Sequence, residues 1–175
     1  MIEQFFVSEK IVAYCKSLLK LALSSPTLFK DNKQSCLSSN CFATLNLLEF
    51  PHSNIFYNYI DTLRIKCEER IGENLEYVYL HIVDYSNGGS MGEHKHSHNE
   101  DYSFILYLNT CDDGATTLLL REPYKILPTA NKVLLFSSFI SHMSDYSESK
   151  KVLVGGLKKQ TKEFHYGSSQ NSEAP

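Results

Sequence analysis

The chain has 175 residues, of which 42% are hydrophobic, and a formal net charge of −3 at pH 7. A chain of this length buries enough apolar surface to fold without disulfides or a structural metal. Its only basic clusters are short, so we expect no nucleic-acid partner. Five cysteines without a Cys-x-x-Cys pair, and no secretion signal at the N-terminus, predict a cytoplasmic protein.

Two amphipathic helices are predicted in the N-terminal part. The first follows Ser8, a good N-cap residue, and has apolar residues at helical spacing through positions 11–22. The second has the same period through positions 56–71 and ends at Gly72. The apolar part of the first helix is shorter than the ~20 residues that a bilayer requires, so no membrane span is expected. Both helices are predicted to cover a sheet.

From residue 76 onward the hydrophobic period changes to two. In EYVYLHIVDY, the apolar side chains of Val78, Leu80 and Ile82 alternate with more polar ones. Short strands separated by turn residues at this spacing favour a sandwich or barrel of jelly-roll type. The predicted strands cover residues 77–85, 93–98, 103–108, 115–120, 125–127, 132–136, 141–146 and 151–157.

Three of the seven histidines, His94, His96 and His98, lie within five residues. In a strand, His94 and His96 point to the same side and form half of a metal site. Imidazole ligands suit Fe, Zn, Cu or Ni, and the best third ligand elsewhere in the chain is His142. A polar loop without a metal also produces such a pattern, so the motif alone is weak evidence.

Further motifs have a fixed order and spacing around these histidines. The first histidine follows a Tyr, a Gly and an apolar residue at intervals of three, and a strand ending Tyr-Leu-Asn comes next. An acidic turn, CDDGATT, follows, and the last histidine comes six residues after a Phe. The residues are Tyr85, Gly88, Met91, His94, Tyr107, Leu108, Asn109, Pro128, Asn131, Phe136 and His142.

In these motifs, residues 77 to 157 resemble the 2-oxoglutarate and Fe(II)-dependent dioxygenases, in their prolyl-hydroxylase-like branch and small phage-type members. The resemblance implies a mainly β (α+β) fold with N-terminal helices and a double-stranded β-helix (jelly-roll) core of about eight strands. It also implies Fe(II), 2-oxoglutarate and O2 as the cofactor and cosubstrates. The family usually has Asp where this chain has His96. The predicted ligands are therefore His94, His96 and His142, and Glu100 or Asp101 remains the alternative third ligand.

The same resemblance implies a basic residue for the distal carboxylate of 2-oxoglutarate, nine to eleven residues after the last histidine. Lys151 stands nine residues after His142, and Lys150 is the rival. Lysine pairs with a carboxylate, though without the two-pronged geometry of arginine. Tyr107 matches the family's hydrogen-bond donor to that carboxylate, and Tyr85 is a second candidate. His98 is expected to lie outside the ligand set.

The sequence thus predicts one dioxygenase-like domain over residues 1–162, with a helical part over 1–75, a jelly-roll core over 76–162 and a disordered tail over 163–175. The implied reaction hydroxylates an unactivated C–H bond, on a protein or peptide side chain of prolyl type. Two other interpretations remain open. The Gly-x5-His-x-His-x3-Glu spacing from Gly88 to Glu100 also fits a cupin-like metal enzyme without 2-oxoglutarate, and a jelly-roll binding module would need no metal.

Overall fold

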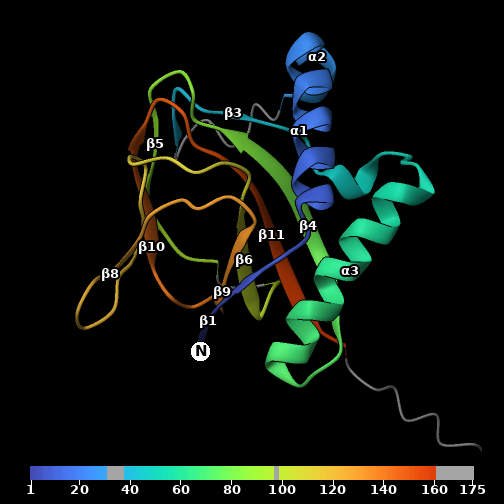
Figure 1. The fold of residues 1–175 in the computed structure, drawn as a ribbon. Helices are drawn as coiled ribbons and strands as arrows, with labels where there is room; N and C mark the ends of the chain where they lie inside the picture. Colours follow the sequence, from blue (N-terminus) through green and yellow to red (C-terminus); the bar gives the residue numbers. More distant parts are fainter. Residues whose placement is uncertain (31–37, 97–98, 161–175) are drawn as a thin grey trace, which may run out of the picture.

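The computed structural model describes residues 1–30, 38–96 and 99–160, and in this part of the chain it is mostly β, with two antiparallel sheets and a few helices (Figure 1). The N-terminal elements are β1 (Ile2–Phe6), α1 (Glu9–Ser24), α2 (Pro26–Phe29), β2 (Ser38–Ser39), β3 (Phe42–Ala43), the 3-10 helix η2 (Leu47–Glu49) and α3 (Asn54–Ile71). The remaining strands are β4 (Leu75–Asp84), β5 (Gly89–His94), β6 (Tyr102–Tyr107), β7 (Thr116–Leu118), β8 (Tyr124–Ile126), β9 (Lys132–Ser137), β10 (His142–Ser147) and β11 (Lys151–Lys159).

The two long helices begin and end where the sequence predicts. The Ser8 side chain accepts a hydrogen bond from the backbone of Lys10, and Ser53 does the same for Phe56. These caps satisfy amide groups that lack a partner in the first helical turn. Gly72 ends α3 in the left-handed conformation. No helix among the described residues is long and apolar enough to cross a membrane.

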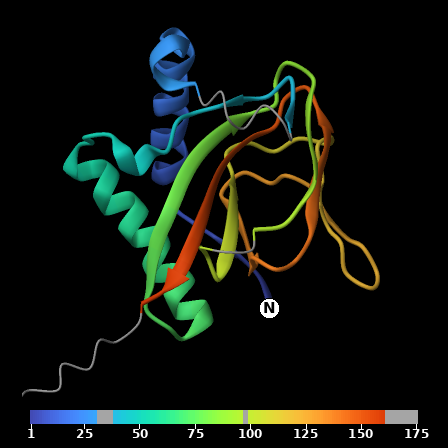
Figure 2. The same cartoon turned by 180° about the vertical axis from the view of Figure 1, so that it is seen from behind.

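The larger sheet has the strand order β1-β9-β6-β11-β4-β3, and the smaller one β2-β5-β10-β7-β8. Helices α1 and α3 cover the outer face of the larger sheet, and the smaller sheet lies on its other side (Figures 1 and 2). In β4, Leu80 and Ile82 are fully buried in the core beneath the helices, while Tyr79 and His81 face the space between the sheets. The predicted alternation is confirmed for residues 79–82. Tyr77, one of the more polar residues in that pattern, instead packs against the core beneath the helices, because the pairing of β4 with β11 shifts register between Tyr77 and Tyr79.

Three parts of the sequence prediction differ from the structure. β1, which pairs antiparallel with β9, and the short strands β2 and β3 lie in the part predicted to be helical. The strand predicted over residues 93–98 instead spans Gly89–His94, so His96 lies beyond its end. His98 and the tail predicted to be disordered over 163–175 lie outside the described residues.

Candidate metal centre and adjoining cavity

Two of the predicted ligands are brought together by strand pairing. β5 and β10 are antiparallel neighbours, and His94 and His142 are directly opposite each other. Their ring centroids are 4.2 Å apart. The two histidines are 48 positions apart in sequence but form one cross-strand pair, because β10 lies beside β5 in the smaller sheet.

The third histidine, His96, is positioned by a different part of the structure from the one predicted. His96 is beyond the end of β5, and its backbone N–H donates to the carbonyl of Ser138 at 3.1 Å. Its ring centroid lies 5.1 Å from that of His94 and 5.3 Å from that of His142. The ligand atoms of the three side chains all lie within 4.8 Å of one another. A backbone hydrogen bond, rather than strand register, thus holds His96 in the cluster.

The hydrogen bonds of the imidazole rings leave one nitrogen of each available. Nδ1 of His94 lies 2.8 Å from the Gly92 carbonyl, and Nδ1 of His142 lies 3.1 Å from the Ile140 carbonyl. Nδ1 of His96 lies 3.1 Å from Glu100 Oε1. Nδ1 of His96 also lies 3.3 Å from the Tyr79 hydroxyl. In the tautomer with the proton on Nδ1, all three Nε2 atoms are lone-pair donors, as metal ligation requires.

Burial keeps two of these rings neutral. Desolvation, assisted by the neighbouring His94, lowers the pKa of His142 to about 3 and that of His96 to about 4. A neutral imidazole is the form that binds a metal. Three imidazole nitrogen donors in one cluster therefore fit Fe(II) and other divalent transition metals.

The two carboxylates considered as alternative ligands lie elsewhere. Oδ2 of Asp101 accepts the backbone N–H of Lys159 at 2.8 Å, so Asp101 helps to pair the loop with β11. Glu100 is buried and contacts the Nδ1 edge of His96, opposite the nitrogen left for a metal. Among the described residues, the three histidines alone form a group with metal-ligand spacing at this site.

A cavity of about 320 Å³ opens beside the histidines, between the two sheets. Its walls are mainly apolar and aromatic, with a few polar groups, which is typical of a small-molecule site. The polar and aromatic side chains in its lining include Tyr79, Tyr85, His94, His96, Thr116, His142, Ser144 and Lys150.

Lys150 is buried and lines this cavity. Its Nζ donates to the Gly114 carbonyl at 2.8 Å and to Ser144 Oγ, and it lies 4.2 Å from the centre of the Tyr85 ring. Desolvation lowers the pKa of Lys150 to about 8. No carboxylate in residues 1–30, 38–96 and 99–160 lies within ion-pair distance of this ammonium. A buried cation without a counter-ion is costly unless a ligand supplies one.

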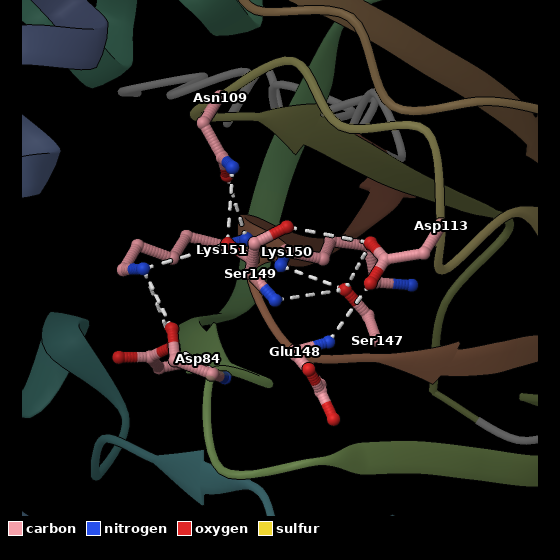
Figure 3. Close-up of polar contacts among 9 residues, drawn as sticks. Asp84, Asn109, Asp113, Ser147, Glu148, Ser149, Lys150 and Lys151 are labelled. Atoms are coloured by element: carbon pink, nitrogen blue, oxygen red, sulfur yellow. Dashed lines mark hydrogen bonds and ion pairs between the residues drawn. The ribbon is translucent and has the colours of Figure 1, made fainter.

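The expectation that Lys151 faces the cavity is wrong. The side chains of Lys150 and Lys151 point in opposite directions (Figure 3), and Nζ of Lys151 donates to Ser86 Oγ at 2.6 Å and lies 3.7 Å from Asp84. Val152 and Val154 line the cavity with Lys150, so the alternating face begins one residue earlier than predicted. A one-residue difference in register exchanges the two faces of a strand.

A polar turn fixes the position of Lys150. Both carboxylate oxygens of Asp113 accept hydrogen bonds from residues 147–149, and Ser147 Oγ in turn accepts the backbone N–H of Lys150 at 2.8 Å (Figure 3). Asn109 donates to the Ser149 carbonyl and accepts from the N–H of Lys151. The acidic turn and the Tyr-Leu-Asn motif of the sequence thus meet at the base of this lysine.

The two tyrosine candidates differ in their surroundings. Tyr85 lines the cavity beside Lys150, and burial raises its pKa. Tyr107 is completely buried, and its hydroxyl donates to Thr116 Oγ1 at 2.9 Å, so Thr116 is the residue that meets the cavity. The sequence analysis did not select Thr116, Ser144 or Tyr79. The polar face of β4 gave a signal for Tyr79, and the CDDGATT motif contains Thr116.

No protein-family model matches the chain, and no similar curated protein was found. Solved structures do match it. A prolyl-4-hydroxylase from Pseudomonas putida has a TM-score of 0.67 at 15% identity, over 91% of this chain and 92% of that one. A Trichoplax adhaerens prolyl hydroxylase, in complex with a hypoxia inducible factor peptide fragment, has a TM-score of 0.67 at 16% identity, over 90% and 83% of the chains.

HygX from Streptomyces hygroscopicus, with nickel and 2-oxoglutarate bound, has a TM-score of 0.65 at 11% identity, over 91% of this chain and 83% of that one. These similarities establish the fold. The chain has the fold of prolyl-hydroxylase-like 2-oxoglutarate oxygenases.

Proposed function

We propose that this protein is a non-haem Fe(II)- and 2-oxoglutarate-dependent dioxygenase whose jelly-roll domain hydroxylates an unactivated C–H bond. One observation carries the proposal. A single cavity is lined by three clustered histidines and by a buried lysine whose ammonium pairs with no carboxylate of the described residues. The first feature suits a metal and the second suits an anionic ligand.

In this proposal, His94, His96 and His142 hold Fe(II) through Nε2. The iron supplies the activation of O2, so that 2-oxoglutarate, O2 and the C–H substrate become succinate, CO2 and the alcohol. The contribution of the protein is geometric. Three ligands on one side of a metal leave the opposite side for cosubstrate and oxygen, and apolar walls such as Phe136 and Val154 exclude water from the reaction.

Lys150 takes the role that the resemblance assigned to a basic residue, in place of Lys151. Its Nζ is hydrogen-bonded to Ser144, which lies two residues after His142 on the same face of β10. Two residues along a strand span about 7 Å. A five-carbon dicarboxylate is of comparable length, so one carboxylate can meet the ammonium while the keto-acid end lies at the histidines. Tyr85 and Thr116 flank the ammonium end.

The proposed substrate is a protein or peptide side chain of prolyl type, in the cytoplasm. The support is fold similarity to prolyl hydroxylases, one of them in complex with a peptide fragment. Fold alone is weak support for a substrate. The metal and cosubstrate chemistry therefore stands separately from the choice of substrate.

Anaerobic titration tests the proposal. Fe(II) and 2-oxoglutarate added together under nitrogen should give a visible metal-to-ligand charge-transfer band that neither gives alone. On admission of air, 2-oxoglutarate should be converted to succinate. Metal binding without cosubstrate binding would favour a cupin-like enzyme, and binding of neither would favour a jelly-roll binding module. Either of these outcomes would overturn the proposal.

A further inference from the structure

The unusual third histidine has an acidic neighbour that neither the metal proposal nor the cosubstrate proposal uses. Glu100 Oε1 lies 3.1 Å from Nδ1 of His96. The corresponding nitrogens of His94 and His142 face backbone carbonyls instead. His96 is therefore the one ligand of the three whose second nitrogen meets a group that can carry a full charge.

The fold holds the Glu100 side chain in one place. Its side chain is only 3% exposed, and Oε1 also accepts hydrogen bonds from Ser103 Oγ at 3.1 Å and Tyr79 OH at 3.4 Å. The other oxygen, Oε2, is buried and has no hydrogen-bond partner among the described residues. A buried polar atom without a partner costs free energy. Stability alone therefore does not explain an acid at this position.

The strand beside Glu100 leaves room for its carboxyl group. Oε2 lies against Gly156 of β11, and a Cβ at that position would stand 1.5 Å from it. Any residue other than glycine would displace the carboxyl group or the strand. The absence of a side chain at Gly156 and the donors on β4 and β6 together form a pocket for one acidic side chain.

We propose that Glu100 is a positioning residue for the metal centre: its carboxylate orients His96 from the Nδ1 side of the ring and places a negative charge behind that ligand. This inference rests on the proposed function. A histidine ligand that donates to a carboxylate is a stronger donor with a fixed orientation. Because Glu100 lies at the Nδ1 edge, it acts on the metal only through the imidazole.

The test uses the full-length protein and Co(II) as a probe under nitrogen. Glu100→Gln keeps the size of the side chain and removes its charge. It should weaken Co(II) binding roughly 10- to 100-fold, as loss of such a partner typically does. Glu93→Gln is the matched control, because Glu93 is exposed, is adjacent to His94 in sequence and accepts a hydrogen bond from Ser141 Oγ. It should leave Co(II) affinity within about threefold.

A spectroscopic measurement separates positioning from general damage. In the Co(II) protein, the exchangeable Nδ1–H signals of the three histidines are shifted by the metal, and Glu100→Gln should move the His96 signal while the other two stay. Unchanged affinity and an unchanged spectrum would overturn the inference. So would a loss of one ligand from the Co(II) absorption spectrum, because Glu100 would then be a ligand itself.

A second variant covers the case in which Glu100→Gln does not fold. Gly156→Ala displaces the carboxyl group and keeps its charge, so it should also weaken Co(II) binding by tenfold or more. Normal affinity in folded Gly156→Ala would overturn the inference. If the unsubstituted protein bound no divalent metal, the proposed function would fail. If it bound metal and Glu100→Gln bound it equally well, only the role of Glu100 would fail.

Discussion

The two faces of the larger sheet differ in what they contribute, and the difference is clearest at two adjacent glycines of β11. A Cβ at Gly155 would stand 2.4 Å from the ring of Phe104 and 2.8 Å from Leu80, in the apolar core under the helices. A Cβ at Gly156 would meet Glu100, behind the histidine cluster. The face under the helices therefore stabilises the fold through close apolar packing. The opposite face carries buried polar groups, which cost stability and indicate a functional site.

The largest expected effect is at the metal. His94→Ala and His142→Ala should each abolish binding of one Fe(II) per chain and leave a folded domain, because the core under the helices does not contain them. Metal content after anaerobic loading measures the loss. His81→Gln is the control, since the Nδ1 of His81 lies 2.7 Å from the Thr44 carbonyl and this residue is outside the cluster. Full metal content in either alanine variant would refute the site.

The next effect is at Lys150. Lys150→Ala should weaken 2-oxoglutarate binding roughly 30-fold or more, because loss of one partner of a buried charge-assisted pair typically costs ~2–5 kcal/mol. Fe(II) affinity should change by less than about threefold. Lys151→Ala is the matched control and should be nearly silent, since its ammonium contacts Ser86 and Asp84 outside the cavity. Calorimetry under nitrogen measures both affinities. If Lys151→Ala lost 2-oxoglutarate affinity and Lys150→Ala did not, Lys151 would be the residue that faces the cavity, as the sequence predicts.

A smaller effect is expected from alanine substitutions at the two adjacent glycines of β11, which face opposite sides of the larger sheet. Gly155→Ala overpacks the buried ring of Phe104, which typically costs about 1–3 kcal/mol of unfolding free energy. Its Co(II) affinity should equal that of the unsubstituted protein, whereas Gly156→Ala should lose affinity. Urea unfolding and Co(II) titration of both variants give the comparison. Equal losses of metal affinity in the two would show that the faces are not independent.

The smallest effect is a pH dependence from Lys150, whose pKa is lowered to about 8 in the fold from 10.5. Because the ammonium is buried, keeping it charged in the folded state lowers the unfolding free energy. This cost is fully present below pH 8 and disappears between pH 8 and 10.5, where the folded protein binds fewer protons than the unfolded chain. The unfolding free energy of the ligand-free protein, relative to Lys150→Met, should therefore rise across that range. Affinity for 2-oxoglutarate should fall above pH 8. Lys150→Arg should not show this fall, because arginine stays charged.

Much of the fold follows from local patterns in the sequence. Caps and apolar spacing located α1 and α3 to within three residues, because these signals act over one or two helical turns. Alternation located the faces of β4 over residues 79–82 but not at Tyr77, where a register shift in the pairing with β11 changes the face. Asn131 adopts the left-handed conformation, with φ of 68°, which asparagine tolerates better than most residues. β1 was missed because its pairing with β9 is with residues about 130 positions away.

The candidate site, like the fold, could be predicted from the sequence only in part. The sequence by itself identified the three histidines and a basic residue after the last of them, because residue type and spacing are properties of the chain. It could not decide which lysine faces the cavity, since KVLVGG is buried on both faces and carries no alternation to fix the register. Only the tertiary structure placed Lys150 inward and Glu100 behind His96. Both positions depend on contacts with distant strands and turns, at Gly114, Ser144 and Gly156.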